Sequence, residues 1–249
     1  MHAIKVEIMR VITKVLFIVY QYLIALPVFA CLTLFTAVTT IIFMHWRNCE
    51  WLHKTQQFWS RSFFWLLFMN VEVRGVENIR RGQSYVFVCN HQSMADVFAV
   101  YGWLPVIFKW IMKKELRKIP FVGSACAAAG HIYIDRSSKM AAARSLKEAE
   151  KQLHGGVCVV IFPEGTRTQT GEVGRFKRGA FSIASDLELP ILPISLTGCY
   201  EVMPKGCWYA QRAKVIMHIG KEFDLKDYPE EDRQVAIEAI REEVIKNIH

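Results

Sequence analysis

The sequence lacks the motifs by which several large enzyme classes are recognised. It contains no Gly-x-Ser-x-Gly nucleophile elbow, no P-loop, no Gly-x-Gly-x-x-Gly fingerprint and no His-Glu-x-x-His motif. These absences disfavour serine hydrolases, P-loop nucleotide-binding proteins, dinucleotide-binding oxidoreductases and zinc proteases. Nucleic-acid binding is also disfavoured, because it requires aromatic side chains among basic ones, and the aromatic residues here lie mainly in the N-terminal third.

Cysteine pairing and glycosylation signals are missing as well. The seven cysteines are odd in number and scattered, with no Cys-x-x-Cys pair and no zinc-ligand spacing, and no Asn-x-Ser/Thr sequon occurs. This pattern is typical of free thiols in a reducing compartment. We therefore expect no metal site and a catalytic part that faces the cytosol.

Charge is absent from a long N-terminal run, Val15–Trp46. As one straight helix this run would measure about 48 Å, well over a hydrocarbon core of roughly 30 Å. Pro27 falls near its middle and offers a bend, and basic residues flank both ends, so charge gives no orientation to a single crossing. We predict a helical hairpin bent at Pro27 that enters one leaflet and returns. A true span and a cleaved signal peptide are the alternatives.

Tryptophan and phenylalanine are concentrated in residues 50–69, among lysine, arginine and polar side chains. Such an amphipathic helix is typical of a membrane–water interface, although it could equally pack on a soluble domain. The sequence thus predicts a membrane-associated helical segment over 1–69 and an α/β domain over 70–249.

Short apolar runs alternate with helical patterns through the rest of the chain, which indicates an α/β sheet domain. The 17 residues from Pro163 to Gly179 have no obvious element of their own, and loops of that length are usually functional or disordered. The middle of the chain, 70–220, is basic, with 20 Lys and Arg against 12 Asp and Glu, which suits a phosphate-bearing partner. Strands are expected at 71–73, 85–89, 106–112, 131–134, 157–162, 191–197 and 214–219, and helices from 93, over 121–129, 138–153 and 179–187, and over 229–248.

His91 and Asp96 stand where the predicted strand 85–89 gives way to a helix. One interpretation is structural: Ser93 caps the helix and Asp96 reaches back to its backbone N–H, as in a capping box. The other is catalytic, with an imidazole base oriented by a carboxylate. Both can hold together, because a carboxylate in the first helical turn is kept ionised by the helix dipole.

The block Phe162–Thr168 follows the predicted buried strand 157–162. Ligands of α/β sheets bind beyond the carboxyl ends of strands, Gly165 permits close approach of the backbone, and Arg167 offers a planar fork for phosphate oxygens. A solvated basic turn is the alternative. Weaker candidates at strand ends are Lys113-Lys114 and Asp135-Arg136, while residues 189–193 read by default as packing.

Taken together and in order, these blocks resemble the glycerolipid acyltransferase family with the His-x4-Asp signature. Within that family they resemble the bacterial 1-acylglycerol-3-phosphate acyltransferases. The resemblance covers residues 90–193 and rests on Asn90-His91…Asp96, Lys113–Leu116, Gly130…Asp135-Arg136, Phe162–Arg167 with Phe176–Phe181, and Leu189–Pro193.

The resemblance implies a mixed central sheet flanked by helices, and transfer of an acyl chain to the sn-2 hydroxyl of 1-acylglycerol 3-phosphate, giving phosphatidic acid. The acyl donor would be a thioester of coenzyme A or acyl carrier protein, used as co-substrate without a further cofactor. A thioester is already activated, so a base and an oxyanion site suffice and no covalent acyl-enzyme is needed. The resemblance assigns His91 as general base and Asp96 as its orienting partner, with the acceptor bound by Lys114, Arg136, Glu164, Gly165, Thr166 and Arg167.

The same resemblance assigns residues 189–193 to the acyl-donor side and places the protein at the cytoplasmic membrane, with its catalytic domain on the cytosolic face. Two alternatives remain open. Another lysolipid, such as a lyso-ornithine lipid, could be the acceptor, or the chain could be a non-enzymatic, membrane-attached lipid-binding protein.

Overall fold

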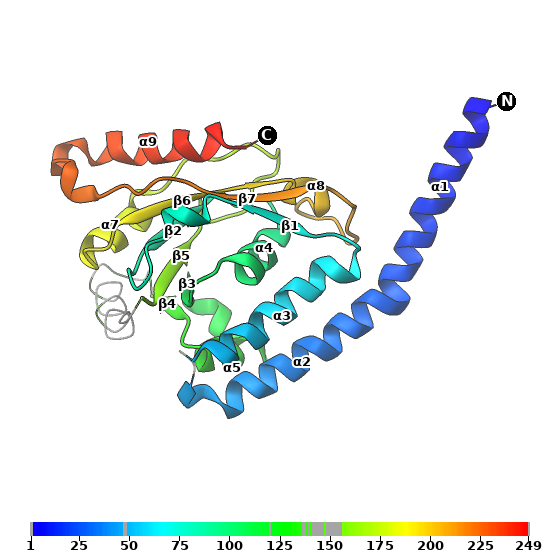
Figure 1. Cartoon of the computed structure of the whole chain (residues 1–249), viewed down its shortest axis with the longest axis horizontal. Coiled ribbons are helices and arrows are strands. Elements are labelled where there is room, and N and C mark those ends of the chain that lie inside the picture. The colour runs from blue at the N-terminus through cyan, green and yellow to red at the C-terminus, as the bar shows by residue number, and fades with distance from the viewer. Residues whose placement is uncertain are drawn as a thin grey trace.

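The N-terminal third begins with one long helix in a computed structural model of the chain (Figure 1). It consists of α1 (His2–Tyr20), a π-helical segment (Gln21–Ala25) and α2 (Leu26–Ile42), and it changes direction between α1 and α2. The prediction that the chain turns back at Pro27 is therefore wrong. The structure describes residues 2–46, 49–119, 121–135 and 156–248, together with Ser138, Met140 and Lys147.

The π-helical segment explains why Pro27 does not end the helix. The Leu26 N–H donates to the Gln21 carbonyl, five residues back, so the backbone has already widened by one residue before the proline. Pro27 then lies in the first turn of α2, where a missing N–H is tolerated best.

A hairpin does form, but its second arm is α3 (Glu50–Leu66), which runs back along α2 (Figure 1). Polar side chains connect the two arms. The indole N–H of Trp59 donates to Thr33 Oγ1 over 2.9 Å, and Gln56 Nε2 donates to Thr40 Oγ1 over 3.2 Å. These bonds give hydrogen-bond partners to half-buried Thr33 and buried Thr40 of an otherwise apolar helix.

Much of the apolar surface of α1 and α2 is exposed, including Leu16, Leu23, Phe35 and Ile42. Residues 5–42 form a single helix that is long and apolar enough to cross a membrane. An exposed apolar area of this length is not expected of a protein surface that faces only water. The feature therefore supports membrane association without fixing its geometry.

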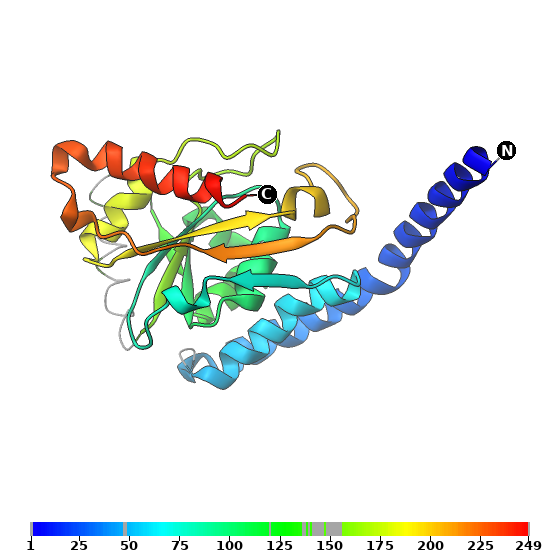
Figure 2. The same ribbon diagram turned by 45° about the horizontal axis from the view of Figure 1, so that its top comes forward.

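The body is a seven-stranded mixed sheet in the order β1-β7-β6-β2-β5-β3-β4. All neighbouring strands are parallel except β6 and β7, whose arrows point in opposite directions in Figure 2. The predicted mixed sheet is confirmed, and every predicted strand is present. The strands are β1 (Val71–Arg74), β2 (Val86–Cys89), β3 (Phe108–Lys113), β4 (Ile132–Ile134), β5 (Cys158–Ile161), β6 (Ile191–Thr197) and β7 (Val215–Ile219).

Helices cover both faces of the sheet. The core that includes α3 and α4 fills one face, and the core that includes α7 and α9 fills the other (Figure 1). Phe64 and Leu67 of α3 belong to the first core, so α3 packs directly on the sheet domain, while the division at residues 69 and 70 stays a prediction. The helices of this body are α4 (Ala95–Trp103), α5 (Val122–Ala128), α7 (Arg178–Asp186), α8 (Cys199–Val202) and α9 (Arg233–Lys246).

Short 3-10 turns connect several of these elements, at Met44–Trp46, Val76–Asn78, Lys114–Lys118, Leu225–Asp227 and Glu230–Asp232. Most of the helix predicted over 138–153 lies outside the described residues, which include only Ser138, Met140 and Lys147 of that range, and the predicted ligand Arg136 also lies outside them.

Candidate active site

Three of the sequence blocks meet at one edge of the sheet. Strands β2, β5 and β3 are parallel neighbours, so their carboxyl ends face the same way. His91 follows β2, Phe162 follows β5 and Lys113 ends β3. This edge is where parallel sheets generally bind ligands.

The carboxylate of Asp96 is fixed by three donors. Its Oδ2 accepts the backbone N–H of Gln92 over 2.6 Å and of Ser93 over 2.7 Å, and it lies 2.9 Å from His91 Nδ1. Asp96 is fully buried in the first turn of α4, where the helix dipole favours an anion. The predicted reach of Asp96 back to Ser93 is thus found together with the contact to the imidazole.

Ser93 plays a slightly different part from the one predicted. The helix starts at Ala95, two residues later than expected, and the Ser93 hydroxyl oxygen accepts the Ala95 N–H over 3.0 Å. The hydroxyl itself donates to the carbonyl of Met203 over 2.7 Å. Ser93 therefore satisfies the helix terminus and also attaches it to the segment after α8.

Asn90 fixes the end of strand β2 just before the histidine. Its amide donates to the Leu196 carbonyl over 2.9 Å and accepts the Leu196 N–H over 2.7 Å, and the side chain is fully buried. A side-chain amide here takes the place of a ladder partner for β6. The Cα of His91 is consequently held by the sheet.

Aromatic rings hold the imidazole from its face. The ring of Phe162 stacks on His91 with centroids 3.9 Å apart and planes 11° apart, and Trp110 in turn stacks on Phe162 with centroids 5.2 Å apart. With Asp96 at Nδ1, this stacking restricts rotation of the imidazole. Phe162 has no predicted role of its own, and its place directly after β5 is the sequence signal that marks it.

Glu164 binds the backbone of the histidine. Its Oε1 accepts the His91 N–H over 2.7 Å, and its Oε2 accepts the Gly174 N–H over 2.9 Å. Burial raises the pKa of Glu164 above its usual range, opposed by these two N–H donors. The long loop after β5 is therefore folded against the end of β2, where His91 lies. Direct contact of Glu164 with substrate stays a prediction.

An apolar cavity of about 570 Å³ opens beside the histidine, within the range typical of small-molecule sites. His91 and Gly165 line it, as does Lys113, and the remaining lining is contributed mostly by apolar side chains of α2, α4, β3 and α5. Apolar residues of the wall include Phe29, Val97, Phe98, Ile111, Met112 and Val122.

The other predicted ligands are placed less directly. Lys114 forms an ion pair with Asp135 at 2.7 Å and is largely exposed. Thr166 is exposed and Arg167 is half-buried, in the loop that returns to His91 through a hydrogen bond from the Thr168 N–H to the His91 carbonyl over 3.0 Å. The binding roles of all three predicted ligands stay predictions.

Two further observations concern the same loop and the strand that follows. A Cβ at Gly165 would lie 3.0 Å from Lys177 Nζ, so this lysine lies beside the glycine, a contact that was not predicted from the sequence. Residues 191–193 pair with β2 inside the sheet, and their predicted part on the donor side is untested.

Buried thiols near Asp96 are poor candidates for a nucleophile. Burial raises the pKa of Cys89 and Cys199 well above the ordinary value, and the Asp96 carboxylate raises both further. Both thiols are therefore protonated at neutral pH, whereas a thiol nucleophile must ionise. A base that activates an external hydroxyl fits this chemistry better than an acyl-cysteine.

A protein-family model described as "Acyltransferase" matches residues 70–197, which include His91, Asp96 and Glu164. The chain belongs to this acyltransferase family. The 1-acyl-sn-glycerol-3-phosphate acyltransferase of Cocos nucifera is 33% identical over 184 residues, covering 73% of this chain and 58% of that one. The enzyme of the same name from Pseudomonas aeruginosa is 36% identical over 169 residues, covering 66% of this chain and 65% of that one.

A solved structure of this acyltransferase family is similar over nearly the whole chain. It is the crystal structure of the 1-acyl-sn-glycerophosphate (LPA) acyltransferase, PlsC, from Thermotoga maritima, with a TM-score of 0.76 and 28% identity, covering 96% of this chain and 98% of that one. The two curated relatives named above are matched over only part of their length, 58% and 65%. The predicted family and fold class are confirmed.

Proposed function

We propose that this acyltransferase moves an acyl chain from a thioester of coenzyme A or acyl carrier protein to the sn-2 hydroxyl of 1-acylglycerol 3-phosphate, giving phosphatidic acid. The observation that carries the proposal is His91 Nδ1, held 2.9 Å from buried Asp96 Oδ2, on the wall of an apolar cavity of about 570 Å³. An oriented base beside a space for a hydrocarbon chain suits acyl transfer to a lipid alcohol. The names of the similar proteins agree with it.

His91 acts as general base in this mechanism. Because Asp96 engages Nδ1, Nε2 is the nitrogen left to take the proton of the acceptor hydroxyl as its oxygen attacks the thioester carbonyl. The new C–O bond forms a tetrahedral oxyanion. Its collapse breaks the C–S bond, and the departing thiolate receives the proton from His91. Asp96 stabilises the imidazolium in between.

The apolar cavity is proposed to take an acyl chain. Since removing apolar area from water contributes about 25 cal/mol per Å², a buried chain supplies much of the binding free energy. The acceptor phosphate is assigned to the basic side of the site, with Arg167 as principal ligand and Lys177 as a further cation beside Gly165. No cofactor is required, because the thioester brings the activated carbonyl.

Attachment to a membrane is part of the proposal. The exposed apolar helix over residues 5–42 would place the cavity next to lipid substrates, with the catalytic body on the cytosolic side. Acceptors other than 1-acylglycerol 3-phosphate, such as a lyso-ornithine lipid, would use the same base and cavity but not the same cations. The acceptor panel below separates them.

The test is an assay of thioester release by purified full-length protein with a panel of lysolipids and both donor types. We expect phosphatidic acid from 1-acylglycerol 3-phosphate, and loss of activity in His91→Ala with an unchanged thermal midpoint. His45→Ala, at an exposed histidine outside the site, is the matched control. Wild-type turnover by His91→Ala would refute the mechanism, and turnover of a different lysolipid alone would refute the acceptor. Lipid binding with no thioester release from any donor would leave the non-enzymatic alternative.

A further inference from the structure

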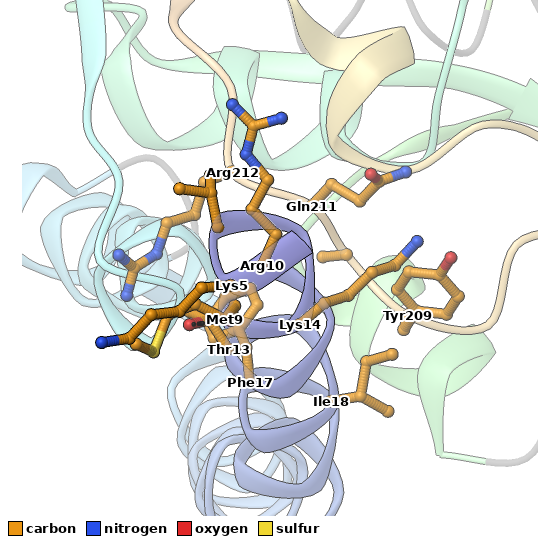
Figure 3. Close-up of a pocket in the computed structure, with 12 residues that line it drawn as sticks. Lys5, Met9, Arg10, Thr13, Lys14, Phe17, Ile18, Tyr209, Gln211 and Arg212 are labelled. Atoms are coloured by element: carbon orange, nitrogen blue, oxygen red, sulfur yellow. Dashed lines mark hydrogen bonds between the residues drawn. The ribbon is translucent and has the colours of Figure 1, made fainter. Parts of the chain in front are cut away.

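A second recess lies between α1 and residues 209–212 (Figure 3). Its volume is about 720 Å³, and it shares no lining residue with the cavity at His91. The walls combine apolar groups such as Met9 and Phe17 with four cationic side chains. These cations, which we call the α1 basic cluster, are Lys5, Arg10, Lys14 and Arg212.

Aromatic rings position two members of the α1 basic cluster. The Arg212 guanidinium lies 4.8 Å from the ring centroids of both Phe17 and Phe68, and Lys14 Nζ lies 5.4 Å from that of Tyr209. Within the part of the chain that the structure describes, no carboxylate forms an ion pair with Lys14 or Arg212. In Figure 3 the side chain of Lys14 reaches from α1 toward Tyr209.

The ion pair between Arg10 and Glu7 offsets little of the positive charge of the recess. Arg10 has Glu7 at 3.9 Å, but both side chains are more than 70% exposed, so the pair is screened and contributes little. Glu7 does not line the recess. An anion with several oxygen acceptors is therefore the ligand that matches the lining by charge.

The position of the recess identifies the source of that anion. One residue beyond Lys14 the helix becomes uncharged and exposes apolar side chains, among them Val15, Leu16 and Val19. Trp208 is 86% exposed in the loop that carries Tyr209. Aromatic and basic side chains at the end of an apolar helix are characteristic of the level of lipid headgroups.

We propose that the α1 basic cluster binds the phosphate of an anionic phospholipid of the surrounding bilayer, at a site separate from the catalytic one. The lipid chains would lie along the exposed apolar face of α1, and the headgroup would occupy the recess. Such a lipid fixes the depth and direction of α1 relative to the sheet domain. The inference rests on the membrane attachment proposed above and not on the acyl-transfer chemistry.

Binding is measured by native mass spectrometry of the full-length protein in detergent, titrated with phosphatidylglycerol or with phosphatidylcholine as probe. We expect tighter binding of phosphatidylglycerol, and a loss in the pair Arg10→Gln/Lys14→Gln. One cation near an anionic lipid is worth about 1 kcal/mol, so two give roughly a 30-fold weaker affinity. Glutamine has a helix propensity like that of arginine and lysine, so α1 remains helical.

The control pair Lys205→Gln/Lys221→Gln removes the same charge outside the recess. Lys205 lies in the same surface loop as Tyr209, and Lys221 lies on the stretch between β7 and α9, away from α1 (Figure 1). Equal losses in both pairs would overturn the site in favour of net charge, and equal binding of the two lipids would overturn it altogether. Displacement of phosphatidylglycerol by inorganic phosphate at matched ionic strength would show a free-phosphate site instead.

Two further measurements distinguish lipid binding at the α1 basic cluster from the proposed catalytic mechanism and from binding of a carrier protein. His91→Ala should bind phosphatidylglycerol as the wild type does, so a failed catalytic mechanism leaves the lipid result intact. If Arg10→Gln/Lys14→Gln binds phosphatidylglycerol normally but loses kcat/KM only with carrier-protein thioesters, the cluster binds an acidic carrier protein and the lipid proposal is wrong.

Discussion

Asp96→Asn changes the charge and the donor pattern of one group while keeping its shape. In the wild type, Oδ2 accepts from Gln92, Ser93 and His91 Nδ1. An asparagine oxygen at the Oδ2 position can keep all three of these contacts, and the amide N–H₂ then takes the position of Oδ1. What the variant loses is the negative charge beside Nδ1, which makes the imidazole more basic and stabilises the imidazolium.

The size of the effect follows from this geometry. General base catalysis contributes about 10²–10⁴-fold, so we expect kcat to fall by a factor in that range, equivalent to roughly 3–5.5 kcal/mol of activation free energy. Hydrogen bonds to a charged group are worth more than those to a neutral one, so the free energy of unfolding should fall by only about 1–2 kcal/mol. The KM for the acceptor should change little, because Asp96 is fully buried and lies behind the imidazole.

The assay follows thiol release from acyl-coenzyme A at saturating acceptor, alongside denaturant unfolding of the same samples. Asp186→Asn, at an exposed carboxylate that ends α7, is the matched control and should leave both kcat and stability unchanged. A folded Asp96→Asn variant whose kcat lies within about threefold of the wild type would refute the orienting role, since the base term alone is expected to exceed about 10².

Three other outcomes are expected. Arg167→Ala should raise the acceptor KM about 10- to 100-fold with little change for the donor, as fits one lost charge-assisted hydrogen bond to phosphate; a purely donor effect would reassign the loop. Gly165→Ala should cost roughly 1–2 kcal/mol in urea unfolding and lower activity, because φ is +72° and the new Cβ meets Lys177 Nζ at 3.0 Å; unchanged stability would contradict this. Burial lowers the pKa of His53 to about 4 and of His131 to about 3, so the unfolded chain binds more protons below pH 6.5. The free energy of unfolding should therefore decrease as the pH is lowered from 6.5 to 4, and at pH 5 it should be roughly 2 kcal/mol per histidine lower than at pH 7. An equally steep pH dependence of stability in His53→Gln would contradict the assignment.

The strands of the sheet could be predicted because each is marked by the residues of its own short segment. Unbroken apolar runs such as 157–162 identify central strands, and β5 is indeed buried between β2 and β3. The expectation that functional residues follow strand ends holds for the same reason, since neighbouring parallel strands present their ends at one edge. His91 and Gly165 meet there at the cavity.

The path of the N-terminal helix could not be predicted from composition. Pro27 would break a regular helix, but the π-helical segment before it changes which N–H groups need partners. A tertiary contact of the Gln21 side chain also holds this part of the helix in place. The side-chain amide donates to the Ala210 carbonyl over 2.9 Å and accepts the Ala210 N–H over 2.8 Å, a contact across 189 positions that no local pattern reveals.

The two carboxylates of the site divide the positioning of one residue. Asp96 holds the ring of His91 through Nδ1, while Glu164 holds its backbone N–H. The ring needs a lasting negative charge beside it when it becomes cationic, and Asp96 has that charge supported by two backbone donors and a helix terminus. Glu164 needs only acceptor oxygens, and its raised pKa fits a group whose task is to fix backbone geometry. The motif after β2 and the motif after β5 therefore position the same residue, His91. A substitution in either motif should displace its imidazole.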